Sequence, residues 1–302
     1  MTKLNSIVLG IKLASKGFEN YRTKYKRNQI RKVLFHTLLN LKFANNWFNY
    51  IKSDDFYTIY SYRPRIYIKP FRPYLSTKFD KKKKVEIILN TYQFLKEKKI
   101  FNTILKEPII ISHIEFNKEY AGELVLGYDE RFRKEGELVL TFRANNLKKE
   151  IVSLAFSFTK NQNGEWDCLI GCVQGYPNKE NFKLFQKLLY GMRPNSFVVF
   201  ALQEIVKNLS CENILSAGSK IQVNRKKHFI NISKFHKIHF NYDKFYEEIG
   251  GIKSTNEWYI LPLSYIRKEL KDVKTNKRNL YKKRYKLLDD ISLQIRSNIK
   301  SI

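Results

Sequence analysis

The chain has 302 residues, of which 43% are hydrophobic and 15% aromatic, and this content excludes an intrinsically disordered protein. Its length allows a substantial core, in one large domain or two small ones. The formal net charge of +29 lies mainly in the flanks, because residues 1–53 hold 11 Lys and Arg against one acid and residues 264–302 hold 12 against four, whereas residues 107–263 are close to balance.

The N-terminal region, residues 1–106, is predicted to be basic and helical. Residues 4–53 indicate two helices, and the second is amphipathic, with Lys and Arg between apolar residues that recur every three or four positions. This helix either packs on the main domain, which we favour, or docks on a membrane. Residues 57–74, rich in Tyr and Arg with three prolines, are predicted to be a connector with strand-like parts, and residues 81–99 a further helix.

The middle region, residues 107–263, is predicted to be an α+β core. Short apolar or alternating runs, separated by turn signals about every 12 to 16 residues, are typical of an antiparallel meander. The runs lie at residues 109–111, 122–128, 136–142, 151–158 and 167–173.

The elements after the meander are predicted in the order helix, helix, strand, helix, strand. They lie at residues 179–189, 194–209, 212–216, 242–249 and 258–263. Pro194 fits the first turn of its helix, and the pair Gly250 and Gly251 ends the helix that begins at Tyr242. The predicted sheet is antiparallel or mixed, and residues 264–302 form a basic helical tail packed on the core.

Cysteine and histidine residues indicate neither a disulfide framework nor a metal site. Cys168, Cys172 and Cys211 are an odd and sparse set, which fits a reducing cytoplasm. Cys168 and Cys172 lie four apart on a predicted strand, so we expect both side chains on the same face, as core thiols. His228, His236 and His239 do not have metal-motif spacing, and no metal is expected.

Ordered segments along most of the chain resemble the bacterial VirK/YbjX family. The strongest segment covers residues 241–251 and 257–263, where an aromatic helix, two glycines and a strand follow one another. The other segments are Arg72-Pro73-Tyr74-Leu75, Tyr92-Gln93-Phe94-Leu95, residues 131–138, residues 169–175, Leu189-Tyr190-Gly191-Met192-Arg193-Pro194 and residues 277–285. Residues 216–223 depart from the expected Ser-Asn pair. The resemblance implies a cytoplasmic bacterial protein that supports envelope integrity, virulence or resistance to cationic antimicrobial peptides.

The element order of residues 108–263 also resembles N-acetyltransferase-like (GNAT) folds, although their Gln/Arg-x-x-Gly-x-Gly/Ala pattern is absent. In such enzymes the start of the central helix binds the pyrophosphate of an acyl carrier through free backbone N–H groups. The equivalent segment here contains Gly191, Arg193, Asn195 and Ser196, and Arg193 can pair with phosphate. The resemblance therefore implies acyl-CoA or another acyl carrier as the ligand. The alternative interpretation of this segment is a plain turn between two helices.

Candidate catalytic residues follow from the needs of acyl transfer to an amine, which requires a base and an acid. By position, Tyr246 is the candidate acid, with Tyr242 one turn earlier, and Glu137 is a candidate carboxylate. The alternatives are that both tyrosines are core or rim aromatics and that the charged segment at residues 129–137 is a solvated loop.

Gln174 and Gly175 end a predicted strand, where a glycine beside a polar amide commonly lines a cleft. With Ser219, they complete the predicted ligand cleft.

A second function class stays open, namely a non-enzymatic adaptor whose basic flanks bind anionic membrane or nucleic acid. Tyr and Arg interleaved between residues 57 and 74 suit stacking and phosphate contacts. No apolar stretch approaches the ~18 uncharged residues of a spanning helix, so any membrane contact is expected to be peripheral, at the inner membrane.

Overall fold

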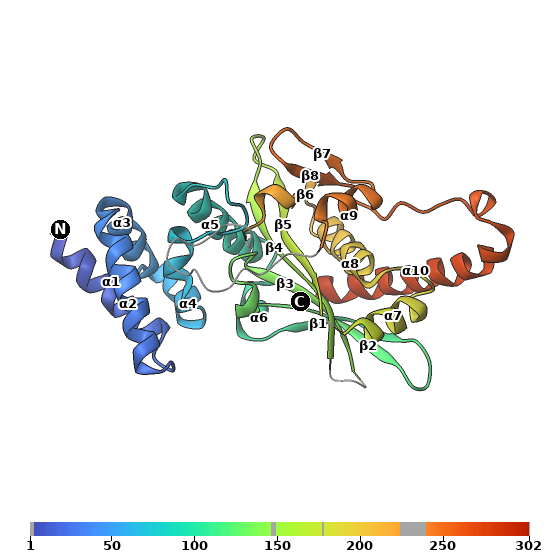
Figure 1. Cartoon of the computed structure of the whole chain (residues 1–302), viewed down its shortest axis with the longest axis horizontal. Helices are drawn as coiled ribbons and strands as arrows, with labels where there is room; N and C mark the ends of the chain where they lie inside the picture. The colour runs from blue at the N-terminus through green and yellow to red at the C-terminus, as the bar shows by residue number, and fades with distance from the viewer. Residues whose placement is uncertain (1–2, 146–148, 177, 224–239, 302) are drawn as a thin grey trace. The chain divides into compact units, whose positions relative to one another are not determined.

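A computed structural model describes residues 3–145, 149–176, 178–223 and 240–301 (Figure 1). The chain forms two compact units. The first comprises Met1–Pro73 and Asp80–Lys84, and the second comprises Tyr74–Phe79 and Val85–Ile302. Within the described residues, no helix is both long and apolar enough to cross a membrane.

The first unit is helical throughout its described elements. They are α1 (Lys3–Gly17), α2 (Thr23–Leu38), α3 (Leu41–Ile51), α4 (Asp54–Tyr62) and the 3-10 helix η1 (Ile66–Phe71). The prediction of a single second helix up to residue 53 was wrong, because the chain breaks between α2 and α3. Asn40 leaves helical geometry with φ −146°, and its side-chain amide donates to the carbonyl oxygen of His36.

The predicted strand-like connector over residues 57–74 was also wrong, since α4 and η1 occupy it. Pro64 follows the end of α4, whereas Pro70 lies within η1. The residues of η1 are all buried, and the indole N–H of Trp47 donates to the carbonyl oxygen of Tyr67 at 2.9 Å. Tertiary burial therefore favours short helical turns where the local pattern indicated extended chain.

The second unit is built on an eight-stranded sheet with the order β1-β2-β3-β4-β5-β6-β8-β7. Neighbouring strands are antiparallel except β5 and β6, which are parallel. The α+β class and the antiparallel meander are thus confirmed. The strands are β1 (Ile109–Glu115), β2 (Ala121–Gly127), β3 (Leu138–Ala144), β4 (Lys149–Lys160), β5 (Trp166–Gly175), β6 (Asn213–Ala217), β7 (Ile252–Lys253) and β8 (Trp258–Leu261).

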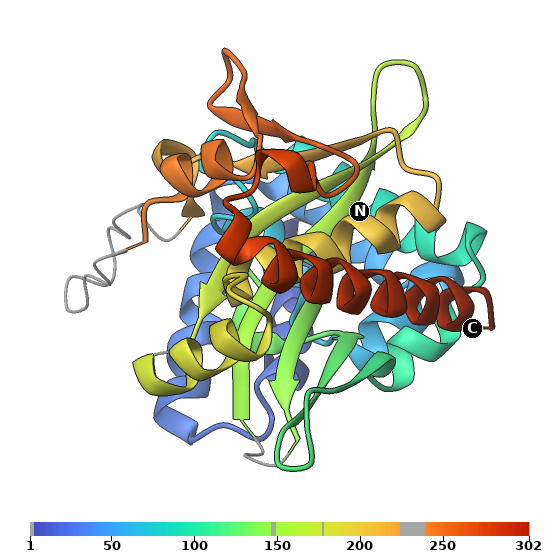
Figure 2. The same cartoon turned by 90° about the vertical axis from the view of Figure 1, so that its right-hand side faces the viewer.

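Except for the short helix at residues 101–106, the main helices of this unit lie where the sequence predicts helical structure. They are α5 (Lys81–Glu97, whose first turn belongs to the first unit), α6 (Phe101–Lys106), α7 (Lys179–Leu188), α8 (Pro194–Asn208), α9 (Tyr242–Glu248) and α10 (Arg278–Ser301), with short 3-10 turns η2 (Glu130–Phe132), η3 (Ser219–Ile221), η5 (Leu270–Asp272) and η6 (Thr275–Lys277). Helices α8 and α10 lie along one face of the sheet (Figure 2). Pro194 begins α8, and Gly250 follows α9 with φ +87°, both as predicted.

The two faces of the central strands differ in polarity. On β4, Leu154 and Phe156 point to the face on which α8 packs, while Ser153 and Ser157 point to the other face and are fully buried. We call this second face the polar face. It also carries Thr141 of β3, whose hydroxyl bonds that of Ser153 at 2.8 Å. Buried hydroxyl groups require hydrogen-bond partners, so the segments that cover this face must supply polar groups.

A β-bulge at Gly171 changes the side-chain direction along β5. Cys172 pairs with Ala155, but Ile170 already pairs with Phe156, so Gly171 is an extra residue. Cys168 and Cys172 therefore point to opposite faces, and the prediction of a shared face was wrong. Both thiols are free and buried, and burial raises their pKa well above the ordinary value.

Candidate functional site

The parallel strands β5 and β6 form a fork. They pair from Asp167 to Ile170 and from Asn213 to Ser216, after which β5 continues alone. Helix α9 lies at this opening, where the Tyr242 hydroxyl donates to the carbonyl oxygen of Val173 at 3.1 Å. Tyr242 is 6% exposed, and burial raises the pKa of its hydroxyl well above the usual range. A side chain thus satisfies a backbone carbonyl that a longer β6 would otherwise bond.

Several buried polar side chains lie where β6 ends. The side-chain oxygens of Ser216, Ser219 and Tyr246 are buried and form no hydrogen bond of normal geometry with any described residue, although the hydroxyls of Tyr246 and Ser216 face each other. Burial raises the pKa of the Tyr246 hydroxyl above its ordinary value, so it remains protonated. Each unsatisfied buried group costs about 1–3 kcal/mol, and such groups commonly mark a site for a ligand or water.

The start of α8 lies against the end of β5. The Asn195 side-chain oxygen is 3.6 Å from the position a Cβ would take on Gly175, and it too is buried without a hydrogen-bond partner among the described residues. Gln174 is exposed on the polar face and pairs with Ser153, and Ser196 is half-buried on α8. Because the first N–H groups of a helix lack intrahelical partners, this end of α8 offers donors beside the fork.

The turn before α8 holds Gly191 and Arg193. Gly191 has φ +80°, and Arg193 is the helix N-cap. The guanidinium group of Arg193 is half-exposed and forms an ion pair at 2.5 Å with Glu248 of α9. Helix α9 also contacts the end of β6, because Asp243 accepts a hydrogen bond from the Ser219 backbone N–H at 2.7 Å.

Glu137 lies in a different neighbourhood, on the polar face. Glu137 is 2% exposed. Its carboxylate accepts a hydrogen bond from the Tyr92 hydroxyl at 2.9 Å, and its backbone N–H donates to the Ser157 hydroxyl at 3.0 Å. The Tyr74 hydroxyl bonds Ser157 at 2.9 Å and also faces Glu137. The predicted residues thus separate into a group around α9 and the fork, and Glu137 in a buried cluster of hydroxyls.

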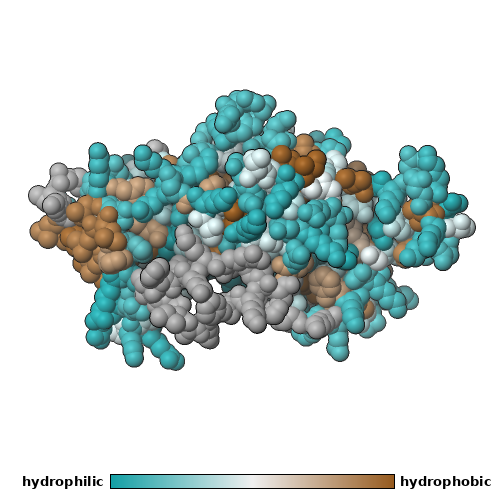
Figure 3. All heavy atoms as spheres, turned by 45° about the horizontal axis from the view of Figure 1, so that its top comes forward, coloured by the Kyte–Doolittle hydropathy of each residue, from teal (hydrophilic) through white to brown (hydrophobic). Residues whose placement is uncertain are grey.

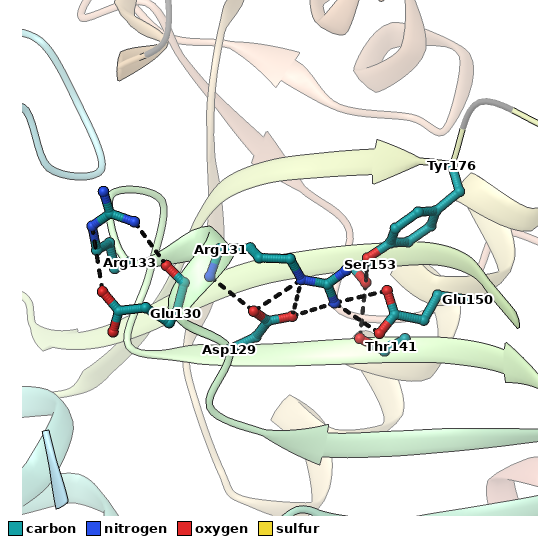
Figure 4. Close-up of polar contacts among 8 residues, drawn as sticks. All are labelled: Asp129, Glu130, Arg131, Arg133, Thr141, Glu150, Ser153 and Tyr176. Atoms are coloured by element: carbon teal, nitrogen blue, oxygen red, sulfur yellow. Dashed lines mark hydrogen bonds and ion pairs between the residues drawn. The ribbon is translucent and has the colours of Figure 1, made fainter. Parts of the chain in front are cut away.

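Sequence reasoning overlooked a charged network at the edge of the polar face (Figure 4). The Arg131 guanidinium bridges Asp129 and Glu150, at 2.7 Å to the latter, and lies over the Tyr176 ring at 5.5 Å. The Tyr176 hydroxyl approaches Ser153 at 3.4 Å. The predicted solvated loop is in part an ordered ion-pair network.

A pocket of about 400 Å³ adjoins this network. Glu150 and Tyr176 belong both to the network and to the pocket lining, which Lys149, Ile151, Asn178, Asn181 and Phe182 complete. The polar face could have been predicted from the sequence, because small polar and large apolar residues alternate along residues 151–158.

The segments that carry the family resemblance meet in space within the second unit. The Leu75 N–H donates to the Lys134 carbonyl oxygen at 2.8 Å. A Cβ on Gly171 would lie 1.8 Å from the Glu135 carbonyl oxygen, so the loop before β3 crosses the bulge in backbone contact. Likewise, Arg284 of α10 bonds the Tyr190 carbonyl oxygen.

No metal centre emerges from the part of the chain that the structure describes, where no three His, Cys, Asp or Glu side chains are grouped to hold an ion. His228, His236 and His239 lie outside the described residues.

Comparison with known proteins places the chain in a family. The model of the family described as "Protein of unknown function (DUF535)" matches residues 22–297. The Escherichia coli K12 protein named "Uncharacterized protein YbjX" is 25% identical over 301 residues, covering 97% of this chain and 90% of the relative. A Haemophilus influenzae protein named "Uncharacterized protein" is 29% identical over 231 residues, covering 75% of this chain and 73% of the relative. No solved structure gives a significant match. The chain therefore belongs to the DUF535 family, and its resemblance to the VirK/YbjX proteins is confirmed.

Proposed function

We propose that the chain binds an acyl carrier with a phosphate-bearing moiety, such as acyl-CoA, at the fork between β5 and β6, as a divergent GNAT-like acyltransferase. The observation that carries this proposal is a set of buried polar atoms beside the fork, on Asn195, Ser216, Ser219 and Tyr246, that form no hydrogen bond of normal geometry with the described residues. A thioester with its amide-rich arm supplies both donors and acceptors for such atoms. The start of α8, with Gly191 and Arg193, suits the phosphate.

The proposed chemistry is transfer of the acyl group from sulfur to an amine. The amine nitrogen attacks the thioester carbonyl carbon, the C–N bond forms and the C–S bond breaks. Tyr246 is the proposed acid that donates a proton to the departing thiolate, and a base accepts the proton of the amine. Glu137 is the predicted base, and its distance from the fork along the sheet makes transfer through water part of the proposal.

The cellular role in this proposal comes from the family resemblance. We assign the chain to the cytoplasm of a bacterium, where it supports envelope integrity, virulence or resistance to cationic antimicrobial peptides. Acylation of an amine fits this role in chemical terms, because it removes a positive charge from an acceptor or adds an apolar chain to it.

The test is a thermal unfolding assay of the full chain with acyl-CoA, CoA and anionic phospholipid, comparing wild type with Arg193→Ala. A ligand that binds only the folded state at about 100 times its Kd stabilises it by about 2.7 kcal/mol, which is easily detected. We expect stabilisation by a CoA species that Arg193→Ala abolishes. Glu248→Gln is the matched control, because it breaks the same ion pair but leaves the cation free for phosphate.

Equal stabilisation of wild type and Arg193→Ala by CoA would show that the phosphate does not bind at the start of α8. The absence of any response to CoA and acyl-CoA, with Arg193→Ala folding normally, would overturn the proposal.

A further inference from the structure

The first unit exposes a group of large apolar side chains on its first two helices. Figure 3 shows apolar residues gathered over the N-terminal helices, next to long polar side chains. The group, which we call the apolar tip, consists of Leu4 (67% exposed), Val8 (42%), Phe35 (52%), Leu38 (57%) and Leu39 (64%).

Helix packing brings these residues to one place. Gly10 of α1 lies against Val33 and Thr37 of α2, where an added Cβ would be 3.3 Å from each side chain. The short connection makes α1 and α2 antiparallel (Figure 1), so the start of α1 lies beside the end of α2. The exposed residues Leu4 and Val8 therefore lie at the same end of the helix pair as Phe35, Leu38 and Leu39.

The fold does not use these apolar side chains for its own core. Helix α2 buries Gln29, Val33 and Thr37, two of which are polar, while Phe35 and Leu38 on the same helix face solvent. Contiguous exposed apolar surface on a folded protein commonly marks an interaction site. Helix α2 therefore differs from an ordinary amphipathic helix, whose apolar side chains are buried and whose polar side chains are exposed.

The exposed charge along α2 indicates the kind of partner. Residues 20–53 contain no Asp or Glu but eight Lys and Arg, and Lys24, Arg27 and Arg31 on α2 are exposed. This excess of positive charge disfavours a second copy of the same surface as the partner. Four of the five side chains of the apolar tip are aliphatic and do not stack on bases, which favours a bilayer over nucleic acid. Apolar side chains beside cations match the interface of an anionic bilayer, which attracts cations and accepts apolar groups.

We propose that α1 and α2 dock on an anionic lipid bilayer, with the apolar tip inserted at the headgroup boundary and the cations of α2 on the lipid headgroups. This function is independent of acyl transfer at the fork. It would place the chain at a membrane surface without a spanning segment.

The first experiment is co-sedimentation of the full chain with phosphatidylcholine vesicles, with and without phosphatidylglycerol. We expect binding only to the anionic vesicles. The triple variant Phe35→Ser, Leu38→Ser, Leu39→Ser should lose at least about tenfold in affinity, since it removes three apolar side chains from the bilayer interface. The control variant Ile252→Ser, Leu293→Ser changes residues of the second unit that are 72% and 65% exposed and should bind normally.

The second experiment changes charge. The variant Lys24→Glu, Arg27→Glu, Arg31→Glu should lose about fivefold or more in affinity for each cation removed. A matched control changes three exposed lysines of α10 and should keep most of the affinity. These lysines are Lys282, Lys283 and Lys286. Because all changed side chains are exposed or on the surface of helices, the unfolding temperatures should stay near that of wild type.

Three outcomes would overturn the proposal. Equal losses in the α2 and α10 charge variants would mean diffuse attraction with no docking surface. Full binding by the triple-serine variant, together with tight binding of a fluorescent oligonucleotide that the charge variant loses, would point to nucleic acid. A dimer in wild type that the triple-serine variant converts to monomer, without lipid binding in either, would assign the apolar tip to self-association.

Discussion

The guanidinium group of Arg284 on α10 donates two hydrogen bonds, at 2.6 and 3.1 Å, to the backbone carbonyl oxygen of Tyr190. Tyr190 has φ +52° and Gly191 has φ +80°, a left-handed pair that strains the tyrosine. Arg284 therefore stabilises the turn that carries Arg193 into α8. Through this contact the C-terminal helix positions one side of the candidate site.

Arg284→Ala should reduce the free energy of unfolding by about 2–4 kcal/mol, because two charge-assisted hydrogen bonds are lost in a buried setting. Urea denaturation followed by circular dichroism measures this change. Arg296→Ala, on an exposed position of the same helix, should change stability by less than about 0.5 kcal/mol. Equal effects of the two changes would contradict the role given to Arg284.

Gly171→Ala should be strongly destabilising, by more than about 3 kcal/mol, because its Cβ would lie 1.8 Å from the Glu135 carbonyl oxygen and the backbone must shift. Gly164→Ala is the control, because it makes the same substitution at a glycine that has open space around it. Gly164 has φ +83° with no atom within 4 Å of the added Cβ, so only backbone strain of about 1 kcal/mol is expected. Thermal unfolding of both variants gives the comparison, and a mild Gly171→Ala would contradict the close crossing at the bulge.

Tyr246→Phe should leave the free energy of unfolding unchanged or raise it by up to about 1 kcal/mol, since the lost hydroxyl has no hydrogen bond of normal geometry with the described residues. Tyr242→Phe, in contrast, should cost about 1–2 kcal/mol because it leaves the Val173 carbonyl oxygen without its donor. If the fork binds an acyl carrier, Tyr246→Phe should also lose turnover while keeping the CoA-induced thermal shift. A large loss of stability in Tyr246→Phe would show that its hydroxyl serves the fold.

Stability should fall as pH rises above 10, in part through Tyr176. Burial, with the hydrogen bond to Glu150 as the next cause, raises the pKa of Tyr176 from 10.0 to about 12 in the folded chain. The unfolded chain therefore loses this proton first, so the stabilising contribution is complete below pH 10 and is lost between pH 10 and about 12. Tyr176→Phe should flatten the decline in unfolding temperature over this window, whereas the exposed Tyr62→Phe should leave it unchanged.

Local patterns predicted most of the second unit correctly. The meander appeared in the alternating runs, Pro194 marked the start of α8, and Gly250 marked the end of α9, because each of these signals depends on backbone geometry within a few residues. The errors in the first unit have the opposite cause. Residues 66–71 have no helical periodicity of their own, and only burial makes η1 stable.

The candidate site residues were also predicted from local motifs, whereas their grouping in space depends on the tertiary structure. Gln174, Gly175 and Asn195 were proposed from separate motifs, and folding brings the last two together. Arg131, with Asp129 and Glu150, was overlooked as a network because its partners come from different strands and loops.

The sequence by itself determined the α+β class, the order of the main elements, the basic flanks and the family, since these rest on composition, periodicity and ordered motifs. Only the tertiary structure decided which face each polar side chain occupies. One extra residue, Gly171, reverses the side-chain direction of β5, and a bulge leaves no reliable local signal because it depends on the register with β4. The fork is likewise a feature of the tertiary structure alone, because it forms where β6 ends and β5 continues.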